Sequence, residues 1–159
     1  MSLALVTCST VLEFIQDTKT FNNCINECFE MLDFVGNGML SKDVLCGGLH
    51  RLLSLEYNPQ EEEEEVNNLY EVIFMRFDKD KNGFIDCKEF ECLIRELMLA
   101  MARGIGDSPV LVALEENSLL MKAVQHELAS MNKDRRKTKK REKNVLLDIC
   151  LCCHKLETS

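Results

Sequence analysis

Apolar residues recur every three or four positions through most of this sequence, which is the spacing of one helical face. In residues 20–32 the recurring apolar side chains are Phe21, Cys24, Ile25, Cys28, Phe29 and Leu32. Similar runs precede Asn58-Pro59, lead up to Phe77 and end near Gly104. The spacing predicts a chain built mostly from helices, of the all-α class.

Two segments outside these runs also carry helix signals. Thr10-Val11-Leu12-Glu13 has the spacing of a capping box and predicts a helix near residues 10–17. Ser108-Pro109 is typical of a helix start. The apolar side chains that follow it are Leu111, Leu114, Leu120, Val124, Leu128 and Met131. We expect an amphipathic helical extension over residues 108–131, as one helix or as two with a break near Asn117-Ser118.

The chain contains an internal repeat. When Asp33 is set over Asp78, 45 residues later, the apolar positions on both sides coincide. The aligned pairs include Leu32 with Phe77, Phe29 with Phe74, Leu45 with Phe90 and Leu49 with Ile94. A duplicated helix–loop–helix unit of this length cannot bury its apolar face alone, so the two copies are expected to pack against each other.

The second loop of the repeat, residues 78–89, fits the pattern D-x-[DN]-x-[DN]-G-x5-E at every defined position. Calcium is a hard cation that takes about six to eight oxygen ligands, so short carboxylates and amides at alternating positions can surround it. Gly83 permits the sharp turn between them. The expected ligands are Asp78, Asp80, Asn82, the backbone carbonyl of Phe84, Asp86 through water, and both oxygens of Glu89. We predict one Ca²⁺ site here, for which Mg²⁺ competes.

With this motif in place, residues 20–104 resemble a paired EF-hand domain. The resemblance implies an intact hand over residues 59–104 and a degenerate hand over residues 20–56. In the first loop Val35 and Val44 stand where the second loop has Asp80 and Glu89, so we expect it to bind no calcium. The resemblance also implies a short antiparallel bridge between the two loops, which joins Leu40 to Ile85.

The segment that follows the pair, GIGDSPVLVALEENSLLMKAV, extends this likeness. Together with the pair it resembles small, largely uncharacterised plant calcium-binding proteins over about residues 1–131. The expected organisation is a paired EF-hand domain over residues 1–107, the amphipathic extension over 108–131, and a flexible basic tail over 132–159.

Charge separates the tail from the rest of the chain. Residues 1–131 carry 10 basic and 23 acidic side chains, whereas residues 132–159 carry 9 basic and 4 acidic ones. The acidic body argues against nucleic acid as the main partner, because phosphate binding needs a basic surface. No apolar run is long enough to cross a bilayer, and the first residues lack a secretory pattern. We expect a cytoplasmic protein, with the nucleus as a second location, whose nine cysteines are reduced.

The sequence of the tail is compatible with several functions. Its basic side chains are Arg135, Arg136, Lys137, Lys139, Lys140, Arg141 and Lys143. Such a run can attract anionic lipid, nucleic acid or an import receptor, and the thiols beside it can be acylated. Cys150, Cys152, Cys153 and His154 could hold zinc, although four ligands within five residues are cramped for a tetrahedron. A mobile, solvated tail is the simplest reading.

These features predict a calcium sensor that transmits the calcium signal by binding a helical segment of a target protein. The alternatives are a calcium buffer without a target and a membrane-associated adaptor that uses the basic tail. The extension 108–131 is expected to dock on the hands as a built-in competitor. An enzyme is not expected, because His50, His126 and His154 lie in separate segments without a nucleophile motif. We expect a monomer.

Overall fold

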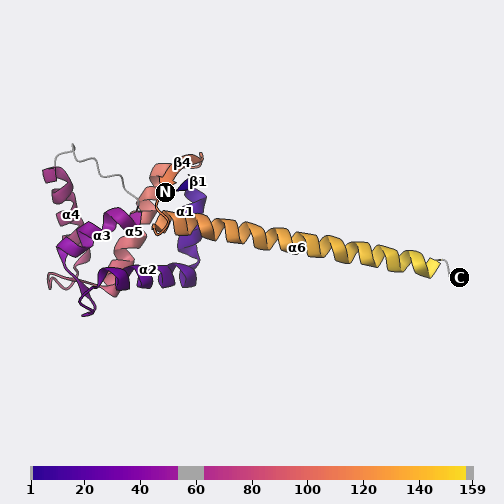
Figure 1. The fold of residues 1–159 in the computed structure, drawn as a ribbon, viewed down its shortest axis with the longest axis horizontal. Coiled ribbons are helices and arrows are strands. Elements are labelled where there is room, and N and C mark those ends of the chain that lie inside the picture. The colour runs from indigo at the N-terminus through magenta and orange to yellow at the C-terminus, as the bar shows by residue number, and fades with distance from the viewer. Residues whose placement is uncertain (1, 54–62, 157–159) are drawn as a thin grey trace. The chain divides into compact units, whose positions relative to one another are not determined.

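The computed structural model describes residues 2–53 and 63–156, which contain six helices and four short strands. Figure 1 shows this arrangement and confirms the predicted all-α class. Within the described residues, no helix has an apolar stretch long enough to cross a membrane. The chain divides into two compact units, residues 1–124 and residues 125–159.

Two helix–loop–helix units form the centre of the first compact unit. The first consists of α2 (Thr18–Leu32) and α3 (Lys42–Leu53), and the second of α4 (Glu63–Phe77) and α5 (Cys87–Ile105). The repeat predicted from the apolar spacing is therefore present. The expected start of the fourth helix at Asn58-Pro59 lies outside the described residues.

Helix α1 (Cys8–Gln16) precedes the pair and begins two residues earlier than predicted. The expected capping box from Thr10 to Glu13 is wrong, because the cap is Thr7. The Thr10 backbone N–H donates to Thr7 Oγ1 at 3.3 Å, and the Thr7 N–H donates to Thr10 Oγ1 at 3.1 Å. A hydroxyl at Thr10 thus closes the box from inside the first turn, a role that a Glu usually takes. Asp17 then ends α1 and caps α2 through the Thr20 N–H.

The buried apolar side chains of both hands belong to one core, and α5 runs through its middle. Helix α5 contacts α1, α2 and α4 (Figure 1). The rings of Phe29 and Phe90 meet edge to face with centroids 5.6 Å apart. The Arg95 guanidinium of α5 lies 5.1 Å from the ring centroid of Phe21 on α2. Both contacts join the first hand to the second, as a duplicated unit with an apolar face requires.

The predicted helix after Ser108-Pro109 is wrong. Residues Val110–Leu114 form strand β4, which pairs antiparallel with β1 (Ser2–Val6) in the register Leu5 to Leu111. The sequence VLVAL mixes two β-branched residues, which favour a strand, with Leu and Ala, which favour a helix. Because local preference is divided, the available partner strand decides its conformation. One face of the ribbon is buried through Val6 and Leu114, whereas Leu3, Leu5 and Leu111 are exposed. Helix α5 ends, as predicted, beside Gly106, whose φ is +70°.

Helix α6 (Leu119–Leu156) corrects the rest of the predicted organisation. Its first turn is capped by Ser118, whose Oγ accepts the Met121 N–H at 3.2 Å, so the break expected near Asn117-Ser118 is a strand-to-helix junction. The first compact unit includes this turn and ends at Val124 rather than at residue 107. The tail, expected to be flexible, is helical from residue 132 to residue 156, because its Lys, Arg and Glu residues are good helix formers.

The start of α6 packs into the body, but the rest of the extension expected to dock does not: Leu111, Leu128 and Met131 are exposed. Leu119, Leu120 and Ala123 are buried in the core of the two hands. Lys122 Nζ pairs with Glu27 Oε2 on α2 at 3.2 Å. The turn before the helix lines, with residues of the first hand, a cavity of about 300 Å³; its wall includes Met31, Leu32, Leu52, Glu115 and Asn117.

Leu120→Ala should therefore destabilise the body by about 2–5 kcal/mol, the usual cost of emptying a buried leucine site. Leu128→Ala is the matched control on the same helix, because Leu128 is 55% exposed and Ala keeps the helix propensity. Urea unfolding followed by circular dichroism measures both. If Leu120→Ala costs no more than Leu128→Ala, the start of α6 does not belong to the core.

Candidate metal centre

The loop from Asp78 to Glu89 is folded around its first carboxylate. Asp78 follows the last residue of α4 and is only 7% exposed. Its Oδ2 accepts the Gly83 N–H at 2.9 Å, and its Oδ1 accepts the Asn82 N–H at 3.2 Å. Gly83 has a φ of +80°, a conformation that glycine adopts without steric cost. The first ligand position and the turn glycine thus close the loop together.

Three carboxylates from this loop converge. Oxygen atoms of Asp78, Asp80 and Glu89 all lie within 4.8 Å of one another. Asp78 and Glu89 are nearly buried, whereas Asp80 is exposed. Like charges this close favour a bound cation, and an all-oxygen set of carboxylates suits a hard divalent ion such as Ca²⁺. The chemistry of the donor set therefore fits the predicted metal.

Glu89 enters the cluster from α5 and is held at both oxygens. Its Oε1 accepts the Lys79 N–H at 3.1 Å, and its Oε2 accepts the Asp86 N–H at 3.0 Å. Asp86 Oδ1 in turn accepts the Glu89 N–H at 2.8 Å, so these two residues form the capping box of α5. A carboxylate in the first turn of a helix is also stabilised by the helix dipole. The position of Glu89 is therefore fixed by the helix.

The remaining predicted ligands lie in the same loop and serve it through hydrogen bonds. Asn82 Nδ2 donates to Asp80 Oδ2 at 3.1 Å, and Asn82 Oδ1 accepts the Phe84 N–H at 2.9 Å. The Phe84 side chain is partly exposed. Asp86 is the cap of α5. The structure thus brings Asp78, Asp80 and Glu89 together and places the other three residues around them.

The first loop repeats this backbone frame without the ligands. Asp33 Oδ2 accepts the Gly38 N–H at 2.8 Å, and Asn37 Oδ1 accepts the Met39 N–H at 3.1 Å. These bonds join the same loop positions as those from Asp78 to Gly83 and from Asn82 to Phe84. Val35, at the third position, has no oxygen to offer and is 84% exposed. Across the part of the chain that the structure describes, the second loop holds the one cluster of three metal-ligating side chains.

Two contacts tie the second loop to the first hand. Strands β2 (Met39–Leu40) and β3 (Ile85–Asp86) pair antiparallel in the register Leu40 to Ile85, which confirms the predicted bridge. The leucine and isoleucine of this pair are buried. Both side chains therefore belong to the core of the paired hands.

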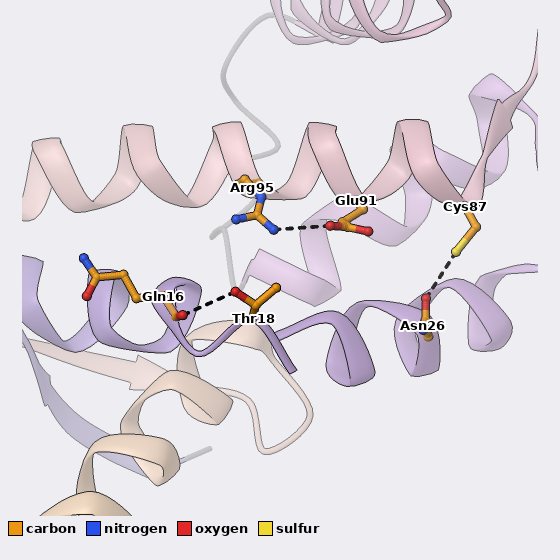
Figure 2. A network of polar contacts seen from close by, with 6 residues as sticks. All are labelled: Gln16, Thr18, Asn26, Cys87, Glu91 and Arg95. Carbon is orange, nitrogen blue, oxygen red and sulfur yellow. Dashed lines mark hydrogen bonds and ion pairs between the residues drawn. The ribbon is translucent and has the colours of Figure 1, made fainter. Parts of the chain in front are cut away.

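The second contact, from Cys87 to Asn26, is not apparent from the sequence. Figure 2 shows the Cys87 thiol at the start of α5 directed at Asn26 on α2, with 3.3 Å between Cys87 Sγ and Asn26 Oδ1. Burial raises the pKa of the Cys87 thiol, and the nearby carboxylates of Glu91, Asp86 and Glu30 raise it further. The thiol thus keeps its proton and can donate it to the amide oxygen. Since the two residues are far apart in the chain, only the packing of α5 on α2 reveals the pair.

Comparison with known proteins agrees with this geometry. Residues 69–101 match the EF-hand domain family. Human calaxin is 26% identical over 99 residues, which cover 59% of this chain and 47% of calaxin, so the chain spans about half the length of this curated relative. No solved structure matches the chain. The likeness to plant proteins stays a prediction. The family match spans the end of α4, the carboxylate loop and most of α5, so it identifies this helix–loop–helix segment as an EF-hand.

Proposed function

We propose that the loop from Asp78 to Glu89 is the single calcium site of this chain, and that the protein acts as a calcium sensor toward a protein partner. The convergence of Asp78, Asp80 and Glu89 carries the proposal. These three carboxylates, Asn82, the Phe84 carbonyl and a water on Asp86 would hold the ion, with Mg²⁺ as a competitor. Bound calcium would supply the positive charge that the clustered carboxylates favour.

The position of Glu89 supports a sensor. Both of its oxygens accept backbone N–H groups, from Lys79 and Asp86, and each oxygen keeps a second lone pair that a cation could take. Glu89 belongs to the first turn of α5, the helix that contacts α1, α2 and α4. A change at this carboxylate therefore acts directly on the helix at the centre of the core.

An exposed apolar stripe on α4 supports a protein partner. Leu69, Val72 and Met75 are spaced by three residues, so they share one face of the helix, and they are 59%, 59% and 66% exposed. Methionine and branched aliphatic side chains on one face suit an amphipathic target helix. The same helix ends at Phe77, one residue before Asp78, the first residue of the calcium loop. We infer a binding role without catalysis, in the cytoplasm.

Calorimetric titration with Ca²⁺ should give one site. Glu89→Gln should weaken binding by about tenfold or more, because the loop loses a carboxylate charge and a symmetric bidentate ligand. Asp43→Asn is the matched control: it removes an acidic charge beside the first loop and should leave affinity nearly unchanged. Two sites of comparable affinity, or equal losses in the two variants, would contradict the single-site proposal.

Sensor and buffer differ in the apolar surface that calcium exposes. If the protein is a sensor, the fluorescence of an apolar dye should rise when Ca²⁺ replaces chelator, and Leu69→Gln with Met75→Gln should reduce that rise. Leu3→Gln with Leu111→Gln is the control, since it removes exposed apolar side chains from the ribbon of β1 and β4. A signal independent of calcium would identify a buffer instead.

A further inference from the structure

The second compact unit presents an exposed, charged helix whose use is not explained by calcium binding. From residue 132 to residue 142 every side chain of α6 is exposed. Seven of these eleven residues are basic and two are acidic. We propose that one face of this helix, formed by Lys133, Arg136, Lys137 and Lys140 and called here the basic face, docks on an anionic lipid membrane.

Helix geometry makes the charge one-sided. At about 100° per residue, the four side chains of the basic face fall within an arc of about 100°. Asp134, Thr138 and Glu142 follow one another at intervals of four and lie on the opposite side. Thr138 Oγ1 bonds to the Asp134 carbonyl of its own helix at 3.0 Å. Arg141 and Lys139 flank the basic face on its two sides, and Arg135 lies among the acidic residues. One side of the helix is therefore purely basic, and the other carries both acidic charges and one arginine.

The basic face is available for a partner. Among the described residues, no ion pair engages any of its four cations, although Lys42, Arg95 and Lys122 elsewhere in the chain are paired. Long basic side chains on a helix that lies along an anionic leaflet each contribute to binding through the surface potential. The acidic balance of residues 1–131 disfavours contact of the body with the same surface.

The one-sidedness favours a flat lipid surface over nucleic acid. A membrane meets one side of a helix, so the basic face can adsorb while Asp134 and Glu142 point to water. A nucleic-acid groove encloses a helix between two phosphate chains, and the acidic side would then face phosphate. The anionic headgroups of a lipid bilayer are therefore the partner that this charge pattern fits.

Sedimentation of the full-length protein with lipid vesicles tests the proposal. Chelator is present throughout, so that calcium cannot bridge the acidic body to lipid. The protein should sediment with vesicles of phosphatidylcholine and phosphatidylserine, and not with phosphatidylcholine alone. Arg136→Gln, Lys137→Gln and Lys140→Gln together should lower the partition coefficient roughly a hundredfold, since each basic side chain near an anionic leaflet contributes about fivefold.

A matched variant separates the basic face from net charge. Lys19→Gln, Lys88→Gln and Arg103→Gln remove the same charge from exposed positions of the body and should leave vesicle binding unchanged. Glutamine is a good helix former, so circular dichroism should show equal helix content in both variants. Equal losses in the two variants would overturn the proposal, as would binding to duplex DNA at concentrations that give no binding to vesicles. Because chelator is present, the outcome is independent of the calcium site.

Discussion

Electrostatic repulsion within one loop is the constraint on which the rest of the structure depends. Asp78, Asp80 and Glu89 bring carboxylate oxygens within 4.8 Å of one another, and two of these residues are nearly buried. At that separation two unit charges repel by roughly 3 kcal/mol for an effective dielectric constant of about 20. The backbone N–H groups of Lys79, Asn82, Gly83 and Asp86 offset part of this repulsion. A divalent cation would offset the remainder, which makes the loop responsive to calcium.

The first hand supports the calcium loop without sharing its chemistry. Its loop keeps the hydrogen bonds from Asp33 and Asn37 that shape an EF-hand loop, and it keeps Leu40 for the bridge to Ile85. Together with the pair of Cys87 and Asn26, these contacts fix the start of α5 against the first hand. The degenerate loop therefore acts as a structural partner, because the backbone frame and the ligand set depend on different residues.

The calcium loop and the repeat could be predicted because their signals are local. Asp78, Gly83 and Glu89 have fixed spacing, and the helices around them have apolar faces of regular period. Strand β4 could not be predicted in this way, since VLVAL pairs with Ser2–Val6, more than a hundred residues earlier in the chain. The cap at Thr7 is not apparent from the sequence, because a threonine, rather than a glutamate, closes its box. The helical tail is equally hard to predict, because a run of charged residues is typical both of a solvated tail and of a helix rich in good helix formers.

Installing the missing ligands in the first loop tests most directly the claim that the two loops share one frame and differ in their ligand set. Val35→Asp with Val44→Glu places carboxylates at the third and twelfth positions, around a frame that Asp33 and Asn37 already hold. Calorimetric titration of this double variant should reveal a second calcium site beside that of Asp78 and Glu89. A double variant that stays folded and still binds one ion would contradict the account, because the frame of the first loop would then differ in more than its ligands.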